Sequence, residues 1–384
     1  MDNPIIRREK VKTLYLVIGN VCVPDRGDTV KLPILSKIFE ENNIKCEFIQ
    51  FVQEVKCHKH RSVKTYSNPF FTFASEFYGL LQNFRGFVKN DIIFVTSPQH
   101  IFYALAVKML GKILVYDVGG YTVQLTDRDA PRLGESSLRN SIYCFVDHFI
   151  TSISTYVIVC NQFDYDYAKT VLNVDTANLF LVPPAVKIPE FDNHGVPGSI
   201  DIQLDLNPRN TVALFVGELS YSGNREAVEI LITKIAPATP NITFLVVGRG
   251  SDTIRNEPHN VILTGFVEDL DRIYEISDLC VVPLISGKGV KTKILEGLAH
   301  GKPIITTKFG IEGLDSPQEI LENGLYVREI DQFAETLISI DWKNVDGKGL
   351  LQYAKSHYSE ECYRNSIKPV ILSLKFNSGN INTR

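Results

Sequence analysis

The sequence predicts an α/β protein of two domains, each built on a parallel β-sheet. The chain of 384 residues is long for one hydrophobic core and natural for two. Apolar, strand-like runs alternate with amphipathic helical segments through the first half, and the alternation restarts at residue 211. Residues 187–210 are rich in Pro, Gly, Asn and Asp and lack a helical period, which is typical of a linker. We therefore predict an N-terminal domain over 1–186, a C-terminal domain over 211–345, and C-terminal helices with a frayed end over 346–384.

The composition is that of an ordinary globular protein and argues against several classes of function. Apolar residues make up 44% and charged residues 22%, and the net charge of −4 argues against general nucleic-acid binding. No signal peptide opens the chain and no run approaches the ~20 apolar residues of a membrane span, so we expect a cytoplasmic protein. The seven cysteines are scattered without a C-x-x-C pair, which favours free thiols in a reducing compartment. Cys57, His58 and His60 lie together but lack a second ligand pair at zinc-finger spacing, so we predict no metal site.

The first half opens with a βαβ unit. An apolar strand over 13–19 is followed by a helix to about residue 43 and a strand over 46–52, which indicates parallel strands with a right-handed crossover. Gly27 and Asp28 lie in the loop after the first strand, at the carboxyl end, where open α/β sheets bind ligands. A plain βα connection with Asp28 as the helix N-cap is the alternative.

The segment 56–89 combines a basic start with an aromatic helix. Its first third contains three lysines, two histidines and an arginine, and nine aromatic or leucine side chains follow between residues 69 and 88. Two interpretations stay open. The helix packs on the sheet after a solvated loop, or it rests on an anionic membrane surface, which would place the protein peripherally at the inner membrane face.

The rest of the first half continues the alternation. The predicted elements are a strand over 91–95, a helix over 99–110, a strand over 112–117, a helix over 135–154, a strand over 156–160, a helix over 163–172 and a strand over 179–182. Asp117 ends a strand and opens the loop 118–132, whose charged residues include Arg128. Charged residues at a strand end are candidate ligand-binding residues, and a solvated loop is the other interpretation.

In the second half, glycines and polar residues follow each predicted strand. The predicted elements are a strand over 211–216, a helix over 225–235, strands over 242–247 and 261–264, and a helix over 268–277. The residues that directly follow these strands are Gly217, Gly248, Arg249, Gly265 and Phe266. Arg225 is the nearest basic residue to the first of these loops, although it is also spaced to pair with Glu229 one turn on.

The segment 279–306 carries the clearest functional pattern. It predicts a buried strand over 279–283, a glycine-bearing loop over 286–290, a helix over 292–300 and a strand over 304–306. A loop of small residues at a helix N-terminus offers unpaired N–H groups and the positive end of the helix dipole, which suit a diphosphate. Lys293, Glu296 and His300 share one helix face, so a carboxylate stands one turn behind that cradle. An ordinary βαβ unit with a Lys293–Glu296 surface pair is the alternative.

This segment resembles the donor-binding segment of the retaining family-4 glycosyltransferases. The resembling residues are Pro283, Gly287–Lys288–Gly289, Lys291, Lys293, Leu295–Glu296, Gly301–Lys302–Pro303, Thr306 or Thr307, and Gly310–Ile311–Glu312–Gly313–Leu314. Many family members have a further glutamate where this chain has Lys288, and the chain matches the branch with G-x-G-x-K-x-K-x-L-E instead.

The resemblance implies the GT-B fold, with two Rossmann-like domains whose parallel sheets face each other across a cleft and a C-terminal helix that crosses back to the first domain. It also implies transfer of a sugar from a nucleotide-diphosphate sugar to a hydroxyl of a glycan or lipid-linked acceptor. The resemblance further implies that the reaction retains the anomeric configuration and needs no cofactor and no obligatory metal. The implied donor-binding residues are Gly217, Arg225, Gly248, Arg249, Gly265, Phe266, Gly287, Lys288, Gly289, Val290, Lys293 and Glu296. The implied catalytic residues are Asp117, Lys291, Lys293 and Glu296, and the acceptor-side residues are Gly27, Asp28, Asp117 and Arg128.

Two other functions remain open on the sequence. A nucleotide-sugar epimerase would share the two-domain architecture and turn over a donor without an acceptor. A catalytically silent nucleotide-sugar-binding or scaffold protein is favoured by Lys288 in place of the glutamate.

The rest of the C-terminal region predicts a strand over 325–328, a helix over 331–340, and a mostly helical tail interrupted near Pro369.

Overall fold

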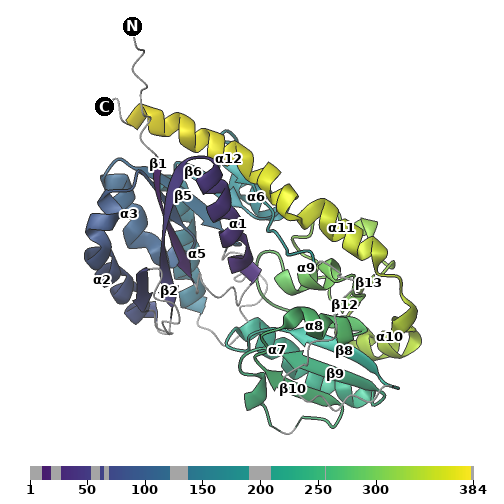
Figure 1. Ribbon diagram of the computed structural model, residues 1–384. Helices are drawn as coiled ribbons and strands as arrows, with labels where there is room; N and C mark the ends of the chain where they lie inside the picture. Colours follow the sequence, from purple (N-terminus) through teal and green to yellow (C-terminus); the bar gives the residue numbers. More distant parts are fainter. Residues whose placement is uncertain are drawn as a thin grey trace. The chain divides into compact units, whose positions relative to one another are not determined.

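The computed structural model describes residues 11–18, 27–52, 61–64, 69–121, 137–189, 209–255 and 257–381. The chain divides into two compact units, each with one sheet whose paired strands are all parallel (Figure 1). Unit 1 consists of Met1–Ala130, Gly134–Pro184 and Tyr363–Arg384, and unit 2 of Pro131–Leu133 and Ala185–Cys362. The predicted fold class, α/β with two parallel sheets, is confirmed.

Unit 1 contains a seven-stranded sheet in the order β3-β2-β1-β4-β5-β6-β7. Its strands are β1 (Val11–Ile18), β2 (Ile44–Val52), β3 (Arg61–Lys64), β4 (Ile92–Val95), β5 (Ile113–Val118), β6 (Tyr156–Val159) and β7 (Leu179–Leu181). All residues of β4, β5 and β6 are buried, because helices cover both faces of the sheet. The chain order reverses between β1 and β4, and such a switch point is where α/β sheets bind ligands.

The helices of unit 1 pack their apolar faces on this sheet. They are α1 (Gly27–Glu41), α2 (Pro69–Val88), the 3-10 turn η1 (Pro98–His100), α3 (Ile101–Met109), α5 (Ser137–Ile153), α6 (Gln162–Thr170) and most of α12 (Glu360–Ile381). Phe87, Tyr103 and Ile150, from three different helices, are fully buried in the core. The C-terminal helix α12 is tied to the first unit, since Arg364 pairs with Glu41 at 2.7 Å. The expected return of the C-terminal helix to the first domain is confirmed (Figure 1).

Unit 2 contains a six-stranded sheet in the order β10-β9-β8-β11-β12-β13. Its strands are β8 (Thr211–Val216), β9 (Ile242–Val247), β10 (Val261–Gly265), β11 (Leu279–Val282), β12 (Ile304–Thr306) and β13 (Leu325–Val327). Phe215, Phe244 and Leu245 are fully buried in a single core. The switch point lies between β8 and β11, the two strands whose following loops carry the strongest glycine patterns.

The helices of unit 2 are mostly short. They are α7 (Ser222–Ile230), α8 (Leu270–Ile276), α9 (Thr292–Ala299), α10 (Phe333–Ser339) and α11 (Lys348–Tyr358). A π-helical turn, η2 (Leu231–Ile235), extends α7. The 3-10 turns are η3 (Ala236–Ala238), η4 (Ser251–Thr253), η5 (Pro317–Glu319), η6 (Ile330–Gln332) and η7 (Trp342–Asn344).

Three features differ from the sequence-based expectations. The four-residue β3 pairs with β2 where a loop was expected. Pro369 lies inside α12 instead of interrupting it, because Ile367, Val370 and Ile371 are buried around it and hold the helix on unit 1. Helix α11 belongs to unit 2, where it packs on α9, so the return to the first unit involves α12 and not the whole of 346–384.

Within the part of the chain that the structure describes, no helix combines the length and the apolar character that crossing a bilayer requires.

Candidate functional site

The candidate site lies at the carboxyl ends of β8, β9, β10 and β11, around the switch point of unit 2. The loops that follow β8 and β11 are interlocked by close contacts. A Cβ atom on Gly223 would lie 3.1 Å from the carbonyl oxygen of Ser286, and one on Gly287 would lie 2.9 Å from the hydroxyl of Tyr221. Ser286 also donates a hydrogen bond of 2.9 Å to Glu226. The β11–α9 loop is therefore held in place by α7 and the turn before it.

The glycines of the β11–α9 loop are required by its backbone. Gly287 has φ +124° and Gly289 has φ +64°, a region that L side chains rarely adopt. Val290 and Lys288 alternate with them and are partly exposed. The loop leads directly into the first turn of α9, where no side chain caps the helix and the helix dipole suits an anion.

Lys293, in the first turn of α9, is a partly buried cation of this site. Its ammonium donates to the side-chain oxygen of Asn224 and lies 4.4 Å from the centroid of the Phe215 ring. A Cβ atom on Gly217 would lie 2.9 Å from the Asn224 side chain and 3.0 Å from the same ammonium, so a larger residue there would displace these two side chains. Burial lowers the pKa of Lys293 to about 7, against a partial opposing effect of Glu296. An anion that reached this ammonium would favour its protonated form.

Lys291 is held differently although it is only two residues away. Its ammonium donates to the carbonyl oxygen of Gly289 at 3.0 Å, stacks 4.2 Å from the Phe309 ring centroid and lies 4.0 Å from the Glu312 carboxylate. Its side chain is 6% exposed. The lysine therefore braces the glycine loop from inside.

Glu296 lies one turn further along α9. Its carboxylate accepts a hydrogen bond of 3.2 Å from the hydroxyl of Tyr274. Burial raises the pKa of Glu296 to about 7, which Tyr274 and Lys293 partly offset. The alternative, a surface pair of Lys293 and Glu296, is not what forms, because Lys293 donates to Asn224 and Glu296 accepts from Tyr274.

The β9 and β10 ends form the other side of the site. Gly248, with φ +143°, approaches β8 so closely that a Cβ atom there would lie 2.1 Å from the carbonyl oxygen of Gly217. Arg249 stacks its guanidinium 4.5 Å from the ring centroid of Phe266. Gly265, with φ +72°, ends β10 and donates its N–H to Ser251.

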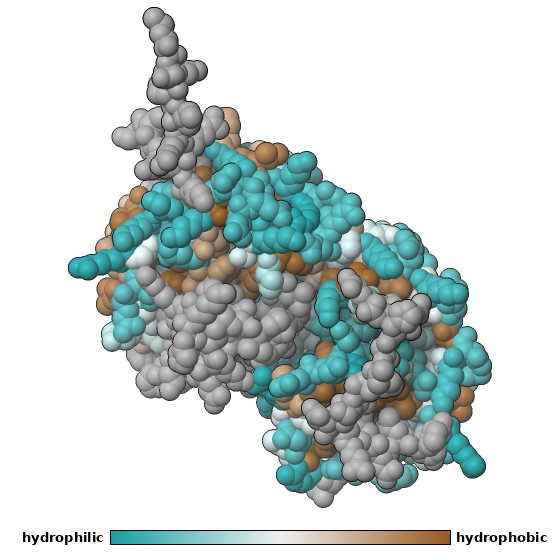
Figure 2. Space-filling view, viewed as in Figure 1, coloured by the Kyte–Doolittle hydropathy of each residue, from teal (hydrophilic) through white to brown (hydrophobic). Residues whose placement is uncertain are grey.

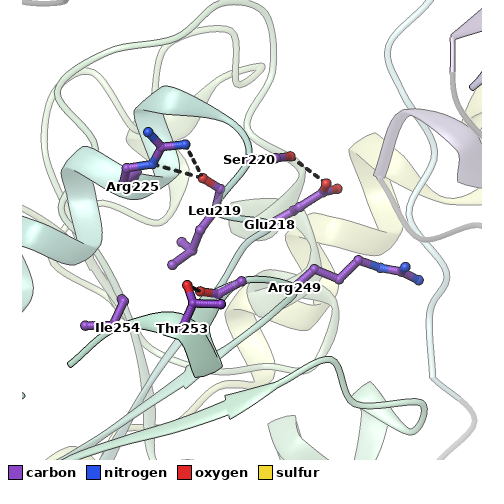
Figure 3. Close-up of a pocket in the computed structure, with 8 residues that line it drawn as sticks. Glu218, Leu219, Ser220, Arg225, Arg249, Thr253 and Ile254 are labelled. Atoms are coloured by element: carbon purple, nitrogen blue, oxygen red, sulfur yellow. Dashed lines mark hydrogen bonds between the residues drawn. The ribbon is translucent and has the colours of Figure 1, made fainter. Parts of the chain in front are cut away.

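A pocket of about 410 Å³ opens beside these strand ends (Figure 3). It is lined by Glu218, Leu219, Ser220, Arg225, Arg249, Gly250, Thr253 and Ile254. Two guanidinium nitrogens of Arg225 donate to the carbonyl oxygen of Leu219, at 3.2 and 3.1 Å, so this arginine shapes the β8–α7 loop (Figure 3). Arg249 extends away from that contact. Lys291, Lys293 and Glu296 do not line this pocket.

The residues predicted for the acceptor side belong to unit 1. Asp117, at the end of β5, accepts a hydrogen bond from the hydroxyl of Tyr15 and forms an ion pair of 2.8 Å with Lys31 of α1. It is 7% exposed, and the network explains its position as a structural tie between two strands and a helix. Gly27 and Asp28 begin α1, whereas Arg128 and the Cys57–His60 group lie outside the described residues. Among the described residues, no group of three His, Cys, Asp or Glu side chains is arranged to hold a metal.

Sequence reasoning missed Tyr274, and with it the partner of Glu296. Tyr274 reads as a core residue in the pattern Leu270–Ile276, and its ring is indeed buried. Its hydroxyl meets Glu296 only because α8 and α9 pack together in space.

Known proteins resemble this chain both in sequence and in fold. Residues 210–340 match the family described as Glycosyl transferases group 1. An uncharacterized 44.6 kDa protein in the cps region of Klebsiella pneumoniae is 24% identical over 169 residues, which cover 40% of this chain and 43% of that protein. The chain thus matches less than half of the length of this curated relative.

Two solved structures show the fold over nearly the whole chain. Sucrose-phosphate synthase (tll1590) from Thermosynechococcus elongatus has a TM-score of 0.72 at 15% identity, covering 96% of this chain and 100% of that one. Anabaena Alr3699/HepE in complex with UDP and glucose has a TM-score of 0.64 at 15% identity, covering 94% and 100%. The chain has the GT-B fold, and its residues 210–340 match the glycosyl transferases group 1 family.

Proposed function

We propose that this protein transfers a sugar from a nucleotide-diphosphate sugar to a hydroxyl acceptor, with retention of configuration and without an obligatory metal. The observation that carries the proposal is the glycine loop 287–289, which leads into α9 beside the buried ammonium of Lys293 at the switch point of unit 2. Loop N–H groups, a helix N-terminus and a desolvated cation together suit a diphosphate.

The leaving diphosphate would be stabilised by groups of the chain itself. The negative charge on it grows as the bond to the sugar breaks, so donors that are already oriented lower the barrier. Lys293 and the N–H groups at the start of α9 fill this role. Lys291 acts through the loop, because its ammonium holds the Gly289 carbonyl and so fixes the direction of the neighbouring N–H groups.

Glu296 would bind a ribose hydroxyl of the donor. Its carboxylate lies one helical turn behind the cradle and accepts one hydrogen bond from Tyr274. A carboxylate can accept further bonds, so a hydroxyl pair of the donor would find a free acceptor there. Arg249 and Phe266, stacked at the ends of β9 and β10, are placed to contact the nucleotide base.

UDP-sugars are the first donors to test, and a glycan or lipid-linked glycan is the acceptor class that we propose. The HepE structure holds UDP and glucose, and the Klebsiella relative comes from a cps region. Calorimetry of the purified protein with UDP-, GDP-, ADP- and TDP-sugars, each with and without EDTA, gives the first test. The proposal is supported if one donor binds clearly and EDTA does not change its affinity. It is contradicted if none of the donors binds.

Product analysis then separates this function from its rivals. Transfer that requires an added hydroxyl acceptor and retains the anomeric configuration supports a glycosyltransferase. Turnover of the donor without an acceptor points to an epimerase instead. Donor binding with no transfer to a panel of glycan and lipid-linked acceptors points to a silent binding protein.

We further propose that unit 1 contacts an anionic membrane surface through α2. Phe77, Leu81, Phe84 and Val88 recur every three or four residues on this helix, and each is between 41% and 57% exposed. Arg85, at the same end of the helix, is exposed beside them. Apolar side chains flanked by cations are typical of a helix at a bilayer interface. Brown and teal residues adjoin along the edge of unit 1 on which α2 lies (Figure 2).

Vesicle sedimentation tests the membrane contact. The double variant Leu81→Ser/Phe84→Ser should lose binding to vesicles that contain phosphatidylglycerol, and the wild type should bind vesicles of phosphatidylcholine alone much more weakly. Ile338→Ser on α10 of unit 2, where the side chain is 67% exposed, is the matched control and should bind like the wild type. Equal sedimentation of the double variant and the wild type would rule out α2 as the contact.

A further inference from the structure

Glu296 is held at both its side chain and its backbone by two aromatic residues that stack on each other. Tyr274 donates to the Glu296 carboxylate at 3.2 Å. The imidazole Nδ1 of His300 contacts the Glu296 carbonyl oxygen at 2.8 Å, across the C-terminal turn of α9. The rings of Tyr274 and His300 are parallel within 15°, with centroids 4.2 Å apart. This arrangement links the position of the carboxylate to that of the imidazole.

His300 is fixed in turn by a charged pair on its far side. Its Nε2 contacts the Asp271 carboxylate at 3.1 Å, and the other oxygen of Asp271 pairs with Lys187 at 2.7 Å. A carbonyl oxygen and a carboxylate oxygen only accept hydrogen bonds, so each ring nitrogen of His300 faces an acceptor. The two contacts fix the orientation of the imidazole ring.

We infer that Tyr274 and His300 are positioning residues that orient the Glu296 carboxylate toward the donor ribose. This inference rests on the proposed function, since Glu296 needs a donor to act on. Tyr274 supplies the hydrogen bond that holds the carboxylate, and His300 supplies the surface on which the Tyr274 ring lies. Asp271, which is itself paired with Lys187, holds His300 in place.

The positioning role of Tyr274 and His300 can be tested through the pH dependence of donor binding. An ionised Glu296 accepts hydrogen bonds from the ribose more strongly than a protonated one, so affinity should rise as the pH increases through its pKa of about 7. Lys293 must be protonated to hold the diphosphate, so affinity should fall as the pH increases through its own pKa, also about 7. The charged groups facing Glu296 are Lys293 of α9 and Asp271 of α8, with the Cys280 thiol of β11 nearby. The expected profile is therefore a bell.

Tyr274→Phe is the decisive variant, because it keeps the ring and removes only the hydroxyl. In the wild type, the hydrogen bond from Tyr274 favours the ionised form of Glu296. Removing this bond should therefore raise the pKa of the Glu296 carboxyl further. The acid limb of the bell should move to higher pH while the basic limb stays. Affinity at pH 7 should fall about two- to tenfold, as expected for one hydrogen bond.

Tyr353→Phe is the matched control. Tyr353 is also a buried tyrosine of unit 2 and donates its hydroxyl to the carbonyl oxygen of Asp315, away from Glu296. This variant should lose a comparable hydrogen bond and leave the acid limb where it is. His300→Phe, which keeps a ring against Tyr274 but removes both imidazole contacts, should move the same limb in the same direction.

Calorimetric titration of each variant with the donor bound by the wild type, from pH 5.5 to 9, measures these limbs. An acid limb that does not move in Tyr274→Phe, or that moves equally in Tyr353→Phe, overturns the positioning role. Failure of the wild type to bind any donor overturns the proposed function instead, so the two failures are distinguishable. Thermal melting of each variant confirms that affinities are compared between folded proteins.

Discussion

Donor binding at pH 8 should draw a proton onto Lys293. The ammonium of this lysine is buried against Phe215, and burial lowers its pKa to about 7. At pH 8, a group with that pKa carries its proton in roughly one molecule in ten. The empty site therefore holds a mostly neutral lysine, although the proposed function needs a cation there.

The size of the effect follows from Coulomb's law. A diphosphate charge about 4 Å from the ammonium contributes about 4 kcal/mol at an effective dielectric constant of about 20. That energy favours the protonated lysine about a thousandfold. Nearly every complex then holds a protonated Lys293 at pH 8, so binding should take up about 0.9 proton per donor.

Calorimetry in buffers of different ionisation enthalpy measures this uptake directly. The observed binding enthalpy should vary linearly with the buffer's ionisation enthalpy, and the slope should be close to one proton at pH 8. Lys293→Met should bind more weakly and show a slope near zero. Donor binding by the wild type without proton uptake at pH 8 would refute the placement of the diphosphate against Lys293.

Three further predictions test single residues. Glu296→Gln should weaken donor binding, and it should also stabilise the folded protein by up to about 3 kcal/mol at pH 8 but not at pH 5. The pKa of this carboxyl is raised to about 7 in the folded state, so the wild type loses stability as the pH rises from the pKa of the unfolded chain to that value. Melting curves at the two pH values check this. Gly248→Ala should lower the free energy of unfolding by at least about 2 kcal/mol, because the new Cβ would meet the Gly217 carbonyl. Gly349→Ala in α11, with open space around it, should leave the free energy of unfolding unchanged. Denaturant unfolding compares the two. Asp117→Asn should destabilise unit 1 by about 3 kcal/mol, because it leaves the Lys31 ammonium without its carboxylate. The double variant Asp117→Asn/Lys31→Met should recover part of this lost stability in the same unfolding assay.

The parts of this protein that local patterns determine were predictable from the sequence. The strand β8 (Thr211–Val216) was predicted at its observed bounds, because six apolar or β-branched residues lie between two polar turns. The loop 286–290 was predicted as a glycine loop, and the positive φ angles of Gly287 and Gly289 are the reason why glycine stands there. The start of α9 at Thr292 followed from the same pattern.

The contacts that connect distant segments were not predictable. Tyr274 and Glu296 are 22 residues apart, and nothing in the spacing of either segment indicates that their side chains meet. Asn224 accepts a hydrogen bond from Lys293, 69 residues away, and no local pattern indicates this contact. Pro369 was predicted to interrupt the tail, because the local rule for proline ignores the buried side chains that keep α12 continuous. Each of these errors concerns packing between elements and not the elements themselves.

A lysine whose pKa burial lowers to about 7 would resolve a conflict in the proposed diphosphate site. A permanent charge in a desolvated site destabilises the empty protein, whereas a neutral group gives the departing diphosphate no support. Lys293 can be largely neutral in the empty site and charged in the filled one, because the donor itself supplies the anion that favours its proton. Glu296, whose pKa is raised to about 7, changes in the complementary direction when a ribose hydroxyl donates to it. Both residues lie on α9, one turn apart, so in the proposed site donor binding would favour the charged form of each of them.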